Sequence, residues 1–92
     1  METISGTGKL CDTNQKQVIA TVDYTIWLNP PTKFTTGEWH GRFVLEGNNV
    51  VSLGEYILIL QDNRKGEISI SRREMQPDTT IYYEFQGSGP LK

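Results

Sequence analysis

Apolar and polar side chains alternate with a period of two along most of the chain, which is typical of β-strands with one buried face. The clearest example lies in residues 16–29, where one set of alternate positions is apolar and the other is largely polar. The apolar set is Val18, Ala20, Val22, Tyr24, Ile26 and Leu28. No segment has a convincing helical period of about 3.6 residues. The pattern therefore predicts an antiparallel all-β protein.

Clusters of Pro, Gly, Asn and Asp, which favour turns, divide the alternating pattern into about six strands. The predicted strands are Thr3–Cys11, Lys16–Asn29, Glu38–Glu46, Glu55–Gln61, Gly66–Arg72 and Thr79–Gln86. The segment 62–65, Asp-Asn-Arg-Lys, lies between two of them and predicts a β-hairpin. Residues 72–77 are expected to form at most one short helical turn, because a residue that precedes proline disfavours the helical conformation.

Two features indicate that the strands enclose a core. Residues 56–60 are apolar on both faces, as expected of a strand that is covered on both sides. Gly6, Gly8 and Gly41 share faces with apolar residues, and missing side chains there permit the sharp coiling of a small barrel. We therefore expect one domain, residues 1–92, that forms a six- to seven-stranded antiparallel barrel or a two-layer sandwich, connected as a meander or Greek key.

The net charge, the single cysteine and the lengths of the apolar runs indicate which kinds of partner and which cellular compartment to expect. Nine Lys and Arg against eleven Asp and Glu give a formal charge of −2 with interspersed signs, which disfavours a broad polyanion-binding surface. Cys11 is the single cysteine, so no internal disulfide forms and the cytoplasm is the expected location. Residues 1–10 lack the apolar core of a signal peptide, and the longest apolar run, Tyr56–Leu60, is too short to cross a membrane.

Four segments together carry a resemblance to known proteins: ISGTGKL near the start, ATVDY in the second predicted strand, YILILQDNRKGEISIS in the hairpin and FQGSGPL near the end. The chain resembles a set of short bacterial proteins of unknown function. It differs from them at Asp62-Asn63-Arg64, where Asp-Gly-Arg is more usual, and in the long insert Asn29–Gly37. The resemblance implies a compact β fold and no particular activity.

The sequence offers no pattern that is typical of an active site. A single histidine, His40, and a single cysteine, Cys11, cannot build a zinc site that needs several such ligands. A nucleophilic Cys11–His40 pair requires adjacent strands and an oxyanion hole that has no local signature. The carboxylates are scattered singly on positions that are predicted to face outward, at Asp23, Glu38, Glu46, Glu67 and Glu84. We therefore expect no enzyme activity, no metal and no cofactor.

The remaining interpretation is a binding or assembly module, either a homodimer or a protein that binds a partner. An edge strand, Thr3–Cys11 or Thr79–Gln86, and the loop Asn29–Gly37 are the expected contacts. The candidate anchors are Trp27, Phe34 and Trp39, and the candidate orienting contacts are Arg42, Arg72 and Arg73. Phe34 has a second interpretation, as a plug for the barrel end.

Two further functions are kept as alternatives to a protein-binding module. Aromatic and basic residues on a β-surface can bind single-stranded nucleic acid by stacking and charge neutralisation. A barrel interior can also carry a small ligand, although about six strands normally leave room only for side chains.

Overall fold

The computed structural model describes residues 2–14, 17–29, 37–46, 50–78, 80–89 and 91. These residues form β-strands joined by turns, and the described part of the chain contains no helix. The strands are β1 (Glu2–Asp12), β2 (Val18–Asn29), β3 (Glu38–Leu45), β4 (Gly54–Ile59), β5 (Lys65–Met75) and β6 (Ile81–Ser88). The predicted all-β class is thereby confirmed.

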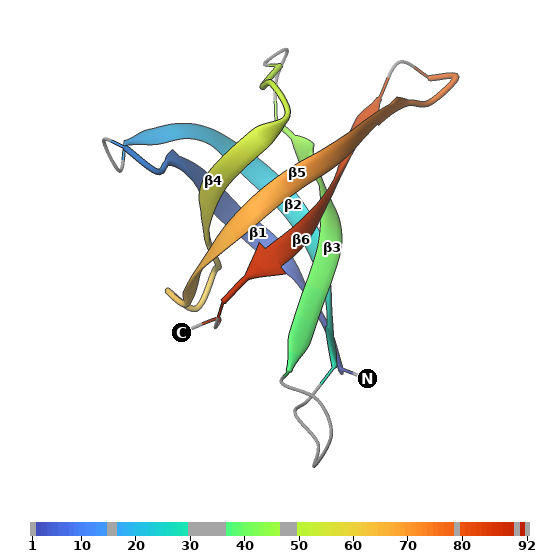
Figure 1. Ribbon diagram of the computed structural model, residues 1–92. Coiled ribbons are helices and arrows are strands. Elements are labelled where there is room, and N and C mark those ends of the chain that lie inside the picture. The colour runs from blue at the N-terminus through green and yellow to red at the C-terminus, as the bar shows by residue number, and fades with distance from the viewer. Residues whose placement is uncertain are drawn as a thin grey trace.

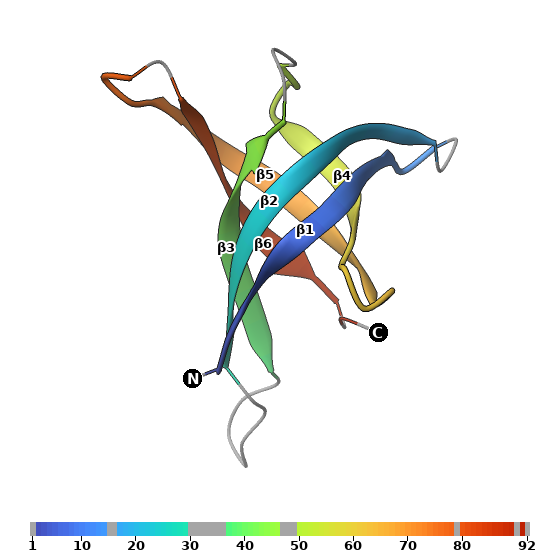
Figure 2. The same ribbon diagram turned by 180° about the vertical axis from the view of Figure 1, so that it is seen from behind.

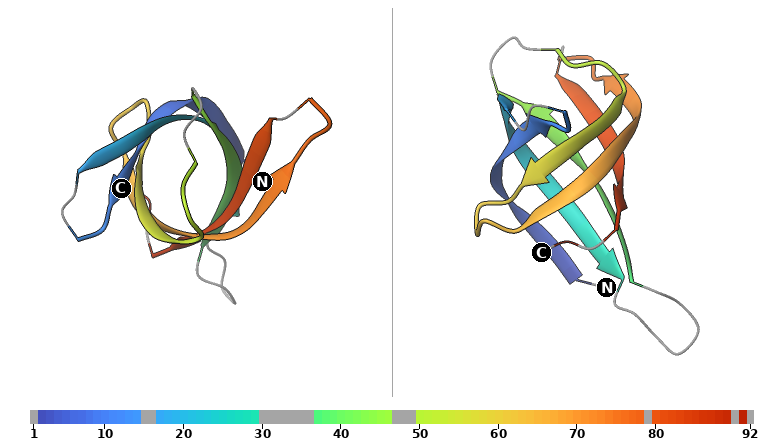
Figure 3. Two further views of the ribbon diagram at one scale, coloured as in Figure 1. Left: turned by 90° about the horizontal axis from the view of Figure 1, so that it is seen from above. Right: turned by 60° about the vertical axis from the view of Figure 1, so that its left-hand side comes forward.

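The strands close into an antiparallel barrel with the order β1-β2-β3-β6-β5-β4, in which β4 pairs again with β1. Opposite views show β1 and β2 on one side and β5 and β6 on the other (Figures 1 and 2). The view from above shows the closed ring (Figure 3). Because β4 follows the β1-β2-β3 meander and lies beside β1, the connection is a Greek key. Of the predicted architectures, the molecule adopts the barrel rather than the sandwich.

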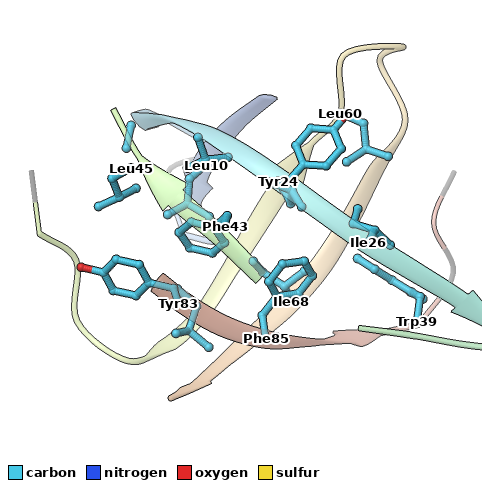
Figure 4. Close-up of a cluster of buried hydrophobic side chains, with 14 residues drawn as sticks. Leu10, Tyr24, Ile26, Trp39, Phe43, Leu45, Leu60, Ile68, Tyr83 and Phe85 are labelled. Carbon is cyan, nitrogen blue, oxygen red and sulfur yellow. The ribbon is translucent and has the colours of Figure 1, made fainter. Parts of the chain in front are cut away.

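Inward-facing side chains from all six strands fill the barrel (Figure 4). The largest fully buried ones are Tyr83, Phe43, Leu10, Ile26, Leu58, Ile68 and Val22. The rings of Phe43 and Tyr83 stack with their centroids 5.1 Å apart. A Cβ atom at Gly8 would collide with the carbonyl oxygen of Ile59, and one at Gly41 with that of Thr25. Both glycines therefore permit the close strand approach that a small barrel requires.

The predicted hairpin joins β4 to β5 through a tight turn. The Asn63 amide donates to the Leu60 carbonyl at 3.0 Å, and the Leu60 amide donates to the Arg64 carbonyl at 2.8 Å. Asn63 has φ of 72°, in the left-handed region that Asn tolerates better than most residues. The Asp62 carboxylate accepts the Arg64 backbone N–H at 3.1 Å, which stabilises the turn and lowers the pKa of this exposed carboxyl.

The predicted end of the fifth strand at Arg72 is wrong, and the one short helical turn that residues 72–77 were allowed does not form among the described residues. Strand β5 continues to Met75 and pairs with β6, with Arg72 opposite Glu84 and Met75 opposite Ile81. A β-bulge between Ile70 and Arg72 adds one residue and changes which face each later side chain occupies. The extended β5–β6 hairpin projects beyond the barrel at the upper right of Figure 1.

Candidate functional site

The N-terminal half of β1 is a strand edge. β1 pairs with β2 from Glu2 to Cys11, whereas β4 covers its other side only from Lys9 to Asp12. Within the described residues, Glu2–Gly8 therefore has a strand neighbour on one side only. The other predicted edge, β6, pairs with both β3 and β5 and is an interior strand.

The direction of the backbone groups along this edge follows from one contact. The Thr7 amide donates to the side-chain Oε1 of Gln61 at 3.3 Å, so it points away from β2. Because N–H and C=O groups alternate sides along a strand, Thr3 and Ser5 also direct theirs away from β2. The Thr3, Ser5 and Thr7 side chains are exposed on the outer face of the barrel. The edge thus offers strand-like donors and acceptors beside small polar side chains.

A second surface feature is a groove of about 280 Å³ on the outer face of β2, β3, β6 and β5. Cross-strand pairing places His40 between Trp27 and Gln86, and places Arg42 opposite Glu84. The Trp27 and His40 rings lie 5.6 Å apart. The groove is lined by Trp27, His40, Gly41, Arg42, Ser71, Glu84, Phe85 and Gln86. Two predicted binding residues, Trp27 and Arg42, are therefore close together on an accessible surface.

The predicted arginines occupy different surroundings. Arg42 lies over the Tyr82 ring, with its guanidinium carbon 5.2 Å from the centroid. Arg72 faces outward opposite Glu84 and forms a long ion pair of 3.9 Å with Glu74. Arg73 is exposed and paired with Tyr83, an inward-facing residue, so it lies on the other face of the hairpin. The bulge in β5 thus separates Arg73 from the groove.

The prediction that Trp39 is a surface anchor is wrong. Trp39 is 5% exposed and packs in the core, edge-on to Phe85, with the ring centroids 6.0 Å apart. Its indole N–H donates to the Gly89 carbonyl at 2.9 Å. Trp39 therefore holds the C-terminal segment on the barrel end and is not available as a surface anchor. Phe34 lies outside the described residues.

Cys11 and His40 do not form a nucleophilic pair. Such a pair requires adjacent strands, whereas β2 separates β1 from β3. His40 pairs with Trp27, and Trp27 pairs with Thr3, which lies eight positions before Cys11 along β1. At about 3.3 Å per residue, this separation is roughly 26 Å along the strand direction. Cys11 is buried, and burial raises the pKa of its thiol although Lys65 and Lys9 partly oppose the shift.

His40 was not among the predicted binding residues, although it lies within the groove. Its position two residues after Glu38 and two before Arg42, on the polar face of one strand, was the available signal. The described residues contain no cluster of three or more His, Cys, Asp or Glu side chains that could hold a metal ion. They also contain no helix of the length and hydropathy needed to cross a membrane.

Comparisons of the whole chain with protein-family models, with curated proteins and with solved structures found no match.

Proposed function

We propose that this barrel is a non-catalytic assembly module that forms a homodimer by pairing the free edge of β1 with the same edge of a second copy. The observation that carries the proposal is the short cover of β1, because β4 reaches only from Lys9 to Asp12. Unpaired backbone groups along a strand edge are a template for another strand.

The edge is suited to a partner identical to itself. Two β1 strands related by a two-fold axis meet antiparallel, so each copy contributes the same donors and acceptors. The outward side chains along the edge are Thr3, Ser5 and Thr7, which are small and uncharged. Such side chains allow close approach without like-charge repulsion across the two-fold axis.

Residues 3–8 of β1 lack the sequence devices that commonly protect a strand edge, and the Gln61 side chain covers the Thr7 amide alone among the described side-chain contacts of this edge. Proteins commonly block edges with proline, with lysine, or with a bulge that twists the strand away. Residues 3–8 contain no charge and no proline, and the bulge in β1 comes later, between Leu10 and Cys11. The exposed edge of β1 is therefore suited to pairing with a strand of another chain.

The proposal includes a cytoplasmic location, supported by the single buried Cys11, which cannot form an internal disulfide.

The predicted contact loop, Asn29–Gly37, follows β2 where Leu28 pairs with Glu2, so its start lies beside the start of β1. Residues 30–36 lie outside the described part of the chain, and the proposal rests on β1 alone.

A proline substitution tests the edge directly. Ser5→Pro removes an N–H that points away from β2, so the β1–β2 ladder keeps its hydrogen bonds while the edge loses a central donor. Ser5→Ala is the matched control, because it changes the side chain and retains the donor. Light scattering after size exclusion, with loading up to about 1 mM, detects even a weak dimer.

We expect a dimer for the wild type and for Ser5→Ala, and a monomer for Ser5→Pro with an unchanged β-sheet circular dichroism spectrum. A monomeric wild-type protein at the highest concentration would overturn self-association. A dimer that survives Ser5→Pro would show that the two copies meet through another surface.

A further inference from the structure

The groove on the outer face of β2, β3, β6 and β5 contains charged side chains that do not form ion pairs with one another. Arg42 and Glu84 are directly opposite across β3 and β6, yet the Arg42 guanidinium lies over the Tyr82 ring. Among the described residues, no ion pair joins Arg42 to Glu84. Ser71 Oγ donates to the backbone carbonyl of Glu84 at 3.5 Å, so this contact does not use the Glu84 carboxylate, and the Glu84 residue is exposed. The groove therefore presents donors and acceptors together.

The charges around the groove balance. Arg42 faces Glu84 across one strand pair, and Arg72, on the other side of Glu84, lies 3.9 Å from the Glu74 carboxylate. Two guanidiniums are thus interspersed with two carboxylates. A phosphate chain gains affinity mainly by neutralisation with clustered Lys and Arg, whereas each of these two arginines has a carboxylate residue beside it on the sheet. Balanced charge favours a neutral, polar ligand.

An aromatic wall accompanies these polar groups. Trp27 is half-buried, with its ring 5.6 Å from the exposed His40 ring, and the two side chains form one side of the groove. Gly41 and Phe85, which are paired across β3 and β6, also line the groove, although the Phe85 ring packs in the core. An aromatic surface beside a few placed polar groups is a common composition for small-ligand sites. The groove volume of about 280 Å³ lies just below their usual range of about 300–1,000 Å³, so the ligand must be small.

We propose that this groove binds a neutral carbohydrate, namely one or two sugar rings of a glycan. A sugar ring has an apolar C–H face that can stack on an indole, and each hydroxyl both donates and accepts a hydrogen bond. Arg42 supplies donors, Glu84 supplies acceptors, and the Gln86 amide supplies both. The groove is separate from the β1 edge, so this binding goes beyond self-association and does not depend on it.

A single-stranded nucleic acid fits the same surface less well. Among the described residues, Trp39 is buried in the core and the Tyr82 ring lies under Arg42, so Trp27 is the tryptophan or tyrosine that this groove offers to a base. Glu84 lies between Arg42 and Arg72 and would repel a phosphate bound by either guanidinium. The carbohydrate is therefore the favoured ligand, and an oligonucleotide becomes the competing outcome of the test.

The test is an NMR titration of the uniformly ¹⁵N-labelled full chain. The probes are a neutral glucose oligomer, a mannose oligomer, an N-acetylglucosamine oligomer and a ten-nucleotide oligothymidylate at low salt. Saccharides are added up to about 20 mM, because a shallow site for one or two rings predicts a dissociation constant on the order of 1 mM. We expect shifts confined to the amides of Trp27, His40, Arg42 and Gln86 and to the Trp27 indole.

Matched variants test whether the saccharide that causes these chemical-shift changes binds in the groove. Glu84→Gln removes an acceptor charge within it and should weaken binding by about tenfold, roughly the effect of losing one charged hydrogen bond. Glu67→Gln, an exposed position on β5 outside the groove, should leave binding unchanged. Trp27→Ala should abolish binding, and its amide spectrum reports whether the fold persists.

The proposal is overturned if no saccharide shifts the groove amides, or if Glu84→Gln and Glu67→Gln weaken binding equally. It is also overturned if only the oligothymidylate shifts these amides, with a response that disappears on adding salt; the groove would then be a nucleic-acid site.

Discussion

At the scale of single residues, Trp39 closes one end of the barrel by filling space that two glycines leave open. Its indole ring occupies the positions where a Cβ atom at Gly87 or Gly66 would lie, and its N–H reaches the Gly89 carbonyl at 2.9 Å. The same ring therefore packs in the core and holds the segment after β6. A change at Gly87 tests this dual role.

Gly87→Ala should destabilise the protein by about 1–3 kcal/mol, the usual cost of forcing extra volume into a packed site. Ser88→Ala is the control, because its side chain is exposed on the same strand. Urea unfolding followed by circular dichroism gives both free energies. A Gly87→Ala variant within about 0.5 kcal/mol of the wild type would mean that Trp39 moves aside without loss.

Cys11 predicts a dependence of stability on pH. Burial raises the pKa of its thiol in the folded protein, so the unfolded chain loses this proton first as the pH rises. The contribution of Cys11 to stability is thus complete below the unfolded thiol pKa of about 8.5 and declines above it, until the folded thiol also ionises.

The difference in unfolding free energy between pH 7.5 and pH 10 should therefore be larger for the wild type than for Cys11→Ala, when both are measured by urea unfolding. The two proteins differ at no other position, so the other contributions to the pH dependence cancel in the comparison. Equal differences would indicate that water reaches the thiol in the folded state.

At the scale of elements, the β4–β5 hairpin depends on the backbone of Asn63. Its φ of 72° costs a β-branched residue about 1–2 kcal/mol, whereas glycine adopts it freely. Asn63→Val should therefore lower the unfolding free energy by about that amount, and Asn63→Gly should leave it nearly unchanged. Thermal unfolding of the two variants against the wild type measures the difference. Similar midpoints for both would show that the turn adopts another conformation.

The elements themselves were largely predictable because a period of two reports which side chains face the core. Val22, Tyr24 and Ile26 were assigned to one face by alternation, and all three are buried. The bulge after Ile70 was not predictable, since it changes the alternation without an apolar residue to reveal it. The polar run Ser71–Glu74 therefore suggested the end of a strand, although β5 continues.

The candidate site was predictable only in part, for the same reason. Trp27 and Arg42 were selected from their residue types, and strand pairing brings them to one groove. Trp39 was selected as a surface anchor from its residue type, but it shares the inward face of β3 with Phe43 and is buried. Glu84 and Gln86 join the groove only because β6 pairs with β3, and alternation within a strand carries no information about its neighbours.

At the scale of the whole molecule, the barrel closes through one short seam. β1 and β4 pair only over Lys9–Asp12 and Tyr56–Ile59, whereas β1 and β2 pair from Glu2 to Cys11. A short ladder requires less free energy to open than a long one, so local opening should begin there. Among the described residues, the same shortness leaves Glu2–Gly8 of β1 with a strand neighbour on one side only, which links the closure of the barrel to the proposed dimer.

Native-state hydrogen exchange, measured by NMR on dilute monomer, should therefore show which of the two strand pairs, β1–β4 or β1–β2, opens more readily. Amides that donate across β1–β4 should exchange faster than amides that donate across β1–β2, and those of Thr3 and Ser5, which point away from β2, should exchange fastest. Raising the protein concentration should slow exchange at Thr3 and Ser5 alone, because pairing of two β1 edges buries these donors while the β1–β4 seam is unchanged. Uniform protection of both seams would show that the barrel opens only by global unfolding.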